Sequence, residues 1–220
     1  MKIGVFDSGV GGLSVANAIE TALPEHEIIY VTDVEHVPYG TKPAVEILGY
    51  VEPILRGLAG QGCEIIVIAC NTVSTTLITE LRAAIPVPLI AMEPMVKPAA
   101  ALTKSGVIAV CATPTTLRSA RYAWLKETYA SGLKIIEPDC SNWSYMIEHK
   151  QIDEKQIETS VESAIADGAD VIVLACTHYH WIEKEIQQIA AHRAQVIQPE
   201  QAVIVELKRQ IDAHSSSQAS

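Results

Sequence analysis

The stretch "EIIVIACNT", residues 64–72, is an apolar run that ends at Cys70 and continues into hydrogen-bonding side chains. A near copy, "DVIVLACTH", fills residues 170–178 and ends at Cys176. Runs that are apolar on both faces are typical of parallel strands covered by helices on both sides of a sheet. The two stretches therefore predict two buried parallel strands, each ending at a thiol.

Short strand-like runs alternate with longer helical segments around these two stretches. "KIGVFD" (2–7) precedes "GGLSVANAIETAL" (11–23), and "SGVIAVCATPTT" (105–116) opens a second series of the same kind. This alternation predicts an α/β protein with two similar domains, each a mainly parallel sheet flanked by helices.

The segment "AMEPMVKPAA" (91–100) is rich in proline and small residues and separates the two halves. We therefore expect a first domain at 1–97 and a second at 98–202. The amphipathic pattern of the last apolar segment predicts a helix at about 203–213 that packs back on the first domain. Residues 214–220 are predicted to be a disordered tail.

The overall charge excludes several classes of function. The chain has 26 acidic and 16 basic residues, a net charge of -10, and no cluster of Lys and Arg, which argues against binding nucleic acid or anionic membranes. No apolar run approaches the roughly 18–20 residues of a transmembrane helix, and the N-terminus has no signal-peptide pattern. Five cysteines without CxxC spacing indicate a reduced compartment, so a cytoplasmic location is expected.

The polar residues that end the strands are the candidates for chemistry, because ligands of open parallel sheets bind at the carboxyl ends of the strands. A thiol there, followed by a helix, lies in a positive field that favours thiolate. Two thiols on opposite faces of one substrate carbon would remove and deliver a proton, which inverts a stereocentre. A single nucleophilic cysteine would instead indicate acyl transfer, and ordinary buried thiols remain the structural alternative.

Two neighbours could tune these thiols. His178 lies two residues after Cys176 and could relay a proton to it, or be a hydrogen-bonded structural histidine. Asp7 ends the first strand and could play a similar part for Cys70, or cap the following helix. The C-x-H spacing of Cys176 and His178 has no second close pair beside it, so no metal site is predicted.

Two loops complete the set of candidates. "DSGVGG" (7–12) departs from the GxGxxG pattern of dinucleotide sites, and its backbone amides could receive the carboxylate of a small substrate. "VPYGT" (37–41) is a turn that could place Tyr39 against a small pocket, or lie plainly on the surface.

Four motifs in order closely resemble the glutamate racemases of the aspartate/glutamate racemase superfamily. They are "IGVFDSGVGGLSV" (3–15), "HVPYGTK" (36–42), "VIACNTVST" (67–75) and "LACTHYH" (174–180), and the resemblance extends from Ile3 to about Ile211. It implies a cofactor-independent enzyme that interconverts L- and D-glutamate, supplying D-glutamate for bacterial peptidoglycan. It also implies an active site in the cleft between the two domains, and a possible homodimer.

The resemblance assigns roles to individual residues. Cys70 and Cys176 would act as opposing acid and base, with Asp7 supporting the first and His178 the second. Glu148, eight residues after Cys140 in "CSNWSYMIE", matches a family glutamate. The implied substrate contacts are Ser8, Pro38, Tyr39, Gly40, Asn71, Thr72, Thr113, Thr116 and Thr177.

Three positions depart from the family pattern around the second thiol. His180 replaces a usual proline, Ala175 a common glycine and His149 a frequent glycine, so a different pocket shape near Cys176 is expected. Two alternatives therefore stay open: a superfamily racemase or decarboxylase acting on aspartate or another small acid such as a hydantoin, or a weakly active homologue that binds a partner protein. His178 favours glutamate, since aspartate racemases tend to have glutamate there.

Regulation by a cell-wall precursor is not expected from the resemblance. Family members that are activated in this way carry an N-terminal extension, whereas here the first motif begins at Ile3.

Overall fold

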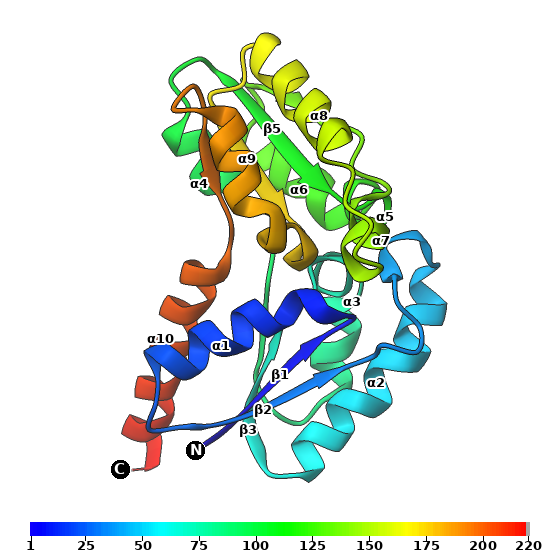
Figure 1. Ribbon diagram of the computed structural model, residues 1–220. Helices are drawn as coiled ribbons and strands as arrows, with labels where there is room; N and C mark the ends of the chain where they lie inside the picture. The colour runs from blue at the N-terminus through cyan, green and yellow to red at the C-terminus, as the bar shows by residue number, and fades with distance from the viewer. Residues whose placement is uncertain (219–220) are drawn as a thin grey trace.

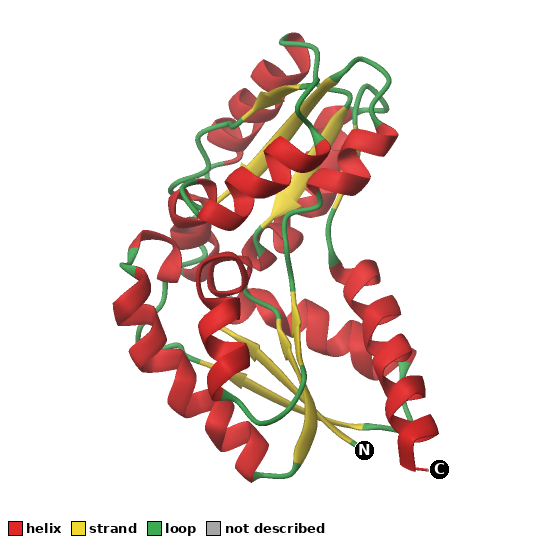
Figure 2. Ribbon diagram, turned by 180° about the vertical axis from the view of Figure 1, so that it is seen from behind, coloured by secondary structure: helices red, strands yellow, loops and turns green. Residues whose placement is uncertain are grey.

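The computed structural model describes residues 1–218, with side chains described through residue 214. Within that part, two four-stranded parallel sheets form two separate lobes, with their strands pointing toward the space between the lobes (Figure 1). Helices cover both faces of each sheet (Figure 2). The predicted two-domain α/β fold is confirmed.

The first domain is built on a sheet with the strand order β2-β1-β3-β4. Its strands are β1 (Lys2–Asp7), β2 (Glu27–Thr32), β3 (Cys63–Ile68) and β4 (Leu89–Ala91). Its helices are α1 (Leu13–Ala22), α2 (Ala44–Gly60) and α3 (Asn71–Ala84), with 3-10 turns η1 (Val10–Gly12) and η2 (Tyr39–Thr41). Because β1 and β3 are adjacent, the segments that follow them lie side by side at one edge of the sheet.

The second domain repeats this order as β6-β5-β7-β8. Its strands are β5 (Val107–Ala112), β6 (Lys134–Ile136), β7 (Val171–Ala175) and β8 (Gln195–Ile197). Its helices are α4 (Val96–Leu102), α5 (Pro114–Leu117), α6 (Ala120–Tyr129), α7 (Trp143–Glu148), α8 (Glu154–Ala166) and α9 (Glu183–Ala190), with the 3-10 helix η3 (Thr177–Ile182). The central pair β5 and β7 corresponds to β1 and β3, so each domain ends its two middle strands at the interface.

Strand β3 shows why the opening stretch is apolar on both faces. Ile66 and Ile68 pack into the layer of α2 and α3, whereas Ile65 and Val67 pack on the opposite side against α1 and the C-terminal helix. Alternate residues of a strand point to opposite faces, so a sheet covered twice needs apolar residues at every position. Each such buried side chain contributes about 1.5–3 kcal/mol of hydrophobic stabilisation.

The chain passes between the domains twice. Met92 packs in the core of the first domain and Val96, the first residue of α4, packs in the core of the second. The expected boundary at residue 97 lies one residue inside α4. After β8 the chain returns, and Val203 and Leu207 of helix α10 (Glu200–Gln218) pack on the first domain.

Helix α10 differs in length from its prediction at 203–213. It begins at Glu200 and continues to Gln218, so residues 214–218 are helical rather than disordered, and residues 219–220 lie outside the described residues. The segment from 200 to 218 contains no glycine or proline, so nothing interrupts the backbone hydrogen bonds there. None of the helices in residues 1–218 combines the length and apolarity needed to cross a bilayer.

Candidate functional site

A narrow cavity of about 10 Å³ lies between the carboxyl ends of the two sheets. Cys70, at the N-cap of α3, lines it from the first domain, and Cys176, at the N-cap of η3, lines it from the second. The volume holds about one water molecule, so the cavity has to widen before a ligand of amino-acid size can bind. The lining residues are Ser8, Pro38, Tyr39, Gly40, Cys70, Asn71, Thr72, Thr113, Ser144, Cys176, Thr177 and His178.

The structure brings the predicted site residues together with few exceptions. Of the predicted substrate contacts, only Thr116 does not line the cavity. It is fully buried behind Thr113, whose side-chain oxygen caps α5 by accepting from the Thr116 backbone N–H. Asp7 and Glu148 lie behind the lining residues and contact them by hydrogen bonds.

Ser144 lines the cavity although the sequence did not single it out. It lies on α7, four residues before Glu148. Residues four apart share one face of a helix. A helix that places Glu148 at the site therefore also places Ser144 there, and helical spacing could have predicted it.

The thiol of Cys70 is in a buried, anionic neighbourhood. The Ser8 hydroxyl lies 3.5 Å from Cys70 Sγ. Burial and the nearby Asp7 carboxylate raise the pKa of Cys70 to about 12. The expected lowering of this pKa by the helix N-terminus is therefore wrong, because burial and Asp7 outweigh it.

Asn71 presents an unused hydrogen-bonding group beside Cys70. Its side chain is 2% exposed and lines the cavity, and among the described residues neither its amide nitrogen nor its oxygen has a partner. An unpaired buried amide costs about 1–3 kcal/mol. A bound ligand with both donor and acceptor groups would remove that cost.

Asp7 uses its carboxylate to join the two domains. Its Oδ2 accepts from the Gly12 backbone N–H at 2.7 Å, and the Thr177 hydroxyl of the second domain donates to it at 3.3 Å. Burial raises the pKa of Asp7. The Val10 N–H is likewise occupied, since it donates to Glu148. The Gly9, Val10 and Gly12 amides of this loop therefore already have acceptors within the protein, and the binding of a substrate carboxylate by the loop stays a prediction.

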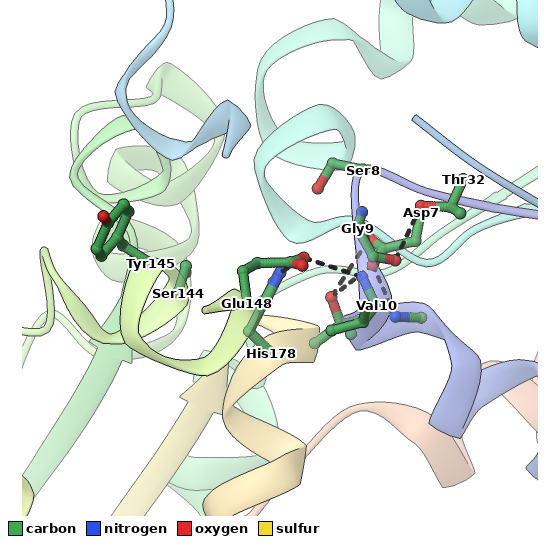
Figure 3. Close-up of polar contacts among 12 residues, drawn as sticks. Asp7, Ser8, Gly9, Val10, Thr32, Ser144, Tyr145, Glu148 and His178 are labelled. Atoms are coloured by element: carbon green, nitrogen blue, oxygen red, sulfur yellow. Dashed lines mark hydrogen bonds and ion pairs between the residues drawn. The ribbon is translucent and has the colours of Figure 1, made fainter. Parts of the chain in front are cut away.

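Cys176 has a different set of partners from Cys70. His178 Nδ1 lies 3.7 Å from Cys176 Sγ, and the Ser144 hydroxyl lies 3.6 Å from it. On its other side, His178 Nε2 contacts Glu148 Oε1 at 2.6 Å (Figure 3). Glu148 thereby orients an imidazole whose second nitrogen faces the thiol.

The charges of these groups support one another. Burial opposes protonation of His178, but its hydrogen bonds to Cys176 and Glu148 prevail and raise its pKa to about 10. Burial also works to raise the pKa of Glu148, yet the hydrogen bonds from His178 and the Val10 N–H hold it below its usual value. At neutral pH His178 is therefore an imidazolium between a carboxylate and a sulfur.

Two glycines of the first loop allow the domains to come this close. A Cβ at Gly9 would overlap Glu148 Oε1 and lie 3.0 Å from His178 Nε2. A Cβ at Gly11 would lie 2.5 Å from the backbone nitrogen of His178. These glycines serve the close approach of the second domain, and the amides of Gly9 and Gly12 donate to the Asp7 carboxylate.

The comparisons with known proteins agree with this geometry. Residues 3–207 match the family model described as Asp/Glu/Hydantoin racemase. The chain belongs to this family. A glutamate racemase from Ectopseudomonas mendocina (strain ymp) is 39% identical over 217 residues, covering 96% of this chain and 82% of that protein. The predicted family resemblance is confirmed.

Two solved glutamate racemase structures of this racemase family share the fold. The Escherichia coli enzyme, in complex with L-glutamate and the activator UDP-MurNAc-ala, has a TM-score of 0.86 at 28% identity, covering 94% of this chain and 80% of that one. The Francisella tularensis enzyme, in complex with D-glutamate, has a TM-score of 0.82 at 27% identity, covering 97% and 82%.

The three departures from the racemase family pattern lie outside the cavity lining. His180 Nδ1 pairs with the Ser14 hydroxyl of the first domain at 3.2 Å, and burial together with His178 lowers its pKa to about 4. The exposed ring of His149 stacks on Tyr145, and Ala175 is the fully buried end of β7. None of these three residues contributes to the cavity lining, so a different pocket shape near Cys176 stays a prediction.

Metal-ligand side chains do not gather in the described part of the chain. Within residues 1–218 no group of three His, Cys, Asp or Glu side chains is placed to hold a metal ion. Cys176 and His178 contact each other instead.

Proposed function

We propose that this chain interconverts L- and D-glutamate without a cofactor, with Cys70 and Cys176 acting on opposite faces of the α-carbon. The observation that carries the proposal is that these two thiols line one cavity from two domains, each at the end of a corresponding central strand. Similar proteins that are named glutamate racemases, solved with L-glutamate and with D-glutamate, support the choice of substrate.

The two thiols would begin the reaction in different protonation states. A protonated Cys70 is favoured by its raised pKa, and Cys176, whose sulfur lies 3.7 Å from His178 Nδ1, would be the base. Cys176 would then take the α-proton, the C–H electron pair would pass into the carbanion and its carboxylate, and Cys70 would give its proton to the opposite face. The thiols end with exchanged protonation, which is the starting state for the reverse reaction.

The substrate carboxylates would be bound by neutral donors. Among the described residues that line the cavity, none is Lys or Arg. Asn71 and Thr72 lie at the N-terminus of α3, where the helix dipole and free backbone N–H groups favour an anion. Such donors, fixed before the reaction, also stabilise the charge that develops on the carboxylate of the carbanion.

The proposal extends to the role of the product. D-Glutamate would be supplied for bacterial peptidoglycan, and the reaction would run in the cytoplasm, since two free thiols need a reducing compartment. Dimerisation stays a prediction of the family resemblance.

Solvent deuterium entering the α-carbon tests the proposal. Each enantiomer of glutamate should exchange and racemise in deuterated buffer, with aspartate and a hydantoin turned over far more slowly. Cys70→Ser and Cys176→Ser should each lower racemisation about 100- to 10,000-fold, because each removes an acid or base. Cys63→Ser is the matched control, a buried cysteine outside the cavity. Unchanged racemisation in either site variant would refute the two-thiol mechanism.

A further inference from the structure

Each thiol of the cavity has a serine hydroxyl beside it from its own domain. Ser8 Oγ lies 3.5 Å from Cys70 Sγ, and Ser144 Oγ lies 3.6 Å from Cys176 Sγ. Both serines are buried and both line the cavity. Ser8 follows β1, whereas Ser144 lies on α7. The two serines therefore occupy similar positions beside a sulfur, although they come from different elements of their domains.

Helix α7 holds Ser144 firmly in this position. Its first residue, Trp143, is fully buried and packs edge-on against Tyr179 of η3, with ring centroids 5.2 Å apart. The Tyr179 hydroxyl in turn donates to the Cys140 carbonyl at 2.9 Å. One turn after Ser144, Glu148 holds His178. The same face of α7 therefore contacts the thiol at one point and its imidazole partner at another.

Ser144 and His178 can serve Cys176 in different ways. An imidazolium donates from both nitrogens, so His178 supports only the thiolate form. A hydroxyl donates to a thiolate and accepts from a thiol, so Ser144 suits a sulfur that must be a base in one direction and an acid in the other.

We propose that Ser144 is a positioning residue for Cys176, whose hydroxyl donates to the thiolate during proton removal and accepts from the thiol during proton delivery. This inference rests on the proposed two-thiol racemisation.

Racemisation alone cannot show which thiol a substitution affects. L- and D-glutamate have equal free energies, so any change in kcat/KM must be the same in both directions. Elimination from 3-chloroglutamate needs one base only: the thiolate takes the α-proton, the C–H electron pair forms the double bond, and chloride leaves with its own pair. The enantiomer that Cys176 serves is the one still processed by Cys70→Ser.

Ser144→Ala should slow chloride release from the enantiomer served by Cys176 about tenfold, and should change release from the other enantiomer less than twofold. Ser144→Thr keeps the hydroxyl and should stay within threefold of the parent, and exposed Ser163→Ala is the matched control.

Equal effects of Ser144→Ala on both enantiomers, or no effect on either, would overturn the role of Ser144 while leaving the two-thiol mechanism standing. Failure of that mechanism has a separate signature, namely undiminished racemisation by Cys70→Ser or Cys176→Ser. Circular dichroism and thermal unfolding of each variant identify loss of fold, and in that case Ser144→Thr decides the question alone.

Discussion

The neighbourhoods of Cys70 and Cys176 begin alike and end differently. Both cysteines follow a buried central strand and occupy the N-cap position of the helix after it. Cys70 then lies near the Asp7 carboxylate, which helps burial to raise its pKa, whereas Cys176 faces an imidazolium held by Glu148. Corresponding positions in two similar domains have therefore acquired opposite electrostatics, which suits one thiol to be the acid and the other the base at the start of a cycle.

Removing the imidazolium should produce the largest effect on this asymmetry. His178→Asn keeps a polar side chain but loses the charge, and a hydrogen bond from a charged donor is worth about 1.5–3 kcal/mol. Elimination from the 3-chloroglutamate enantiomer served by Cys176 should fall about 10- to 100-fold, and from the other enantiomer less than threefold. The control is His149→Asn, since His149 is exposed and outside the cavity. Equal losses with both enantiomers would show that the two neighbourhoods do not differ in this way.

A smaller effect is expected from closing the space at Gly9. The Cβ of Gly9→Ala would overlap Glu148 Oε1, the flexible end of a side chain that can move aside, so the fold should survive. The displaced Glu148 would lose its contact with His178, and racemisation should fall about tenfold. Steady-state racemisation and thermal unfolding together check this.

Gly49→Ala is the matched control for Gly9→Ala. Gly49 lies inside α2 with open space around its Cα, so alanine there should raise the free energy of unfolding by about 0.5–1 kcal/mol and leave the rate unchanged. If Gly9→Ala kept the parental rate, the present position of Glu148 beside His178 would not be required for racemisation.

A further effect is expected on the dependence of stability on pH. The pKa of His178 is about 10 in the folded chain and about 6.5 when unfolded, so the folded state binds this proton more tightly. Its contribution is fully present below about pH 6.5 and is lost as the pH rises toward 10. The difference in free energy of unfolding between the parent and His178→Asn should therefore shrink across this window. Urea unfolding at pH 6, 7.5 and 9 measures it, and a difference that is constant or grows would contradict the shifted pKa.

Much of this molecule follows from local patterns. Alternating strands and helices predicted both sheets, the repeated strand ends indicated the two thiols and His178, and the family resemblance added Glu148. Helix α10 is longer than its prediction, because the polar tail contains no residue that breaks a helix before Gln218. The family resemblance predicts Thr116 at the cavity, but its side chain contacts the Thr113 hydroxyl instead.

The sequence by itself determined which residues end the central strands, since apolar periodicity and chain order decide where a parallel sheet presents its carboxyl edge. Only the tertiary structure decided what faces each sulfur. The pKa of a buried group depends on solvation and on charges a few ångströms away, and those come from segments far apart in the chain, such as Ser144 beside Cys176. For that reason "EIIVIACNT" and "DVIVLACTH" are near copies in sequence, while the thiols within them have different neighbours.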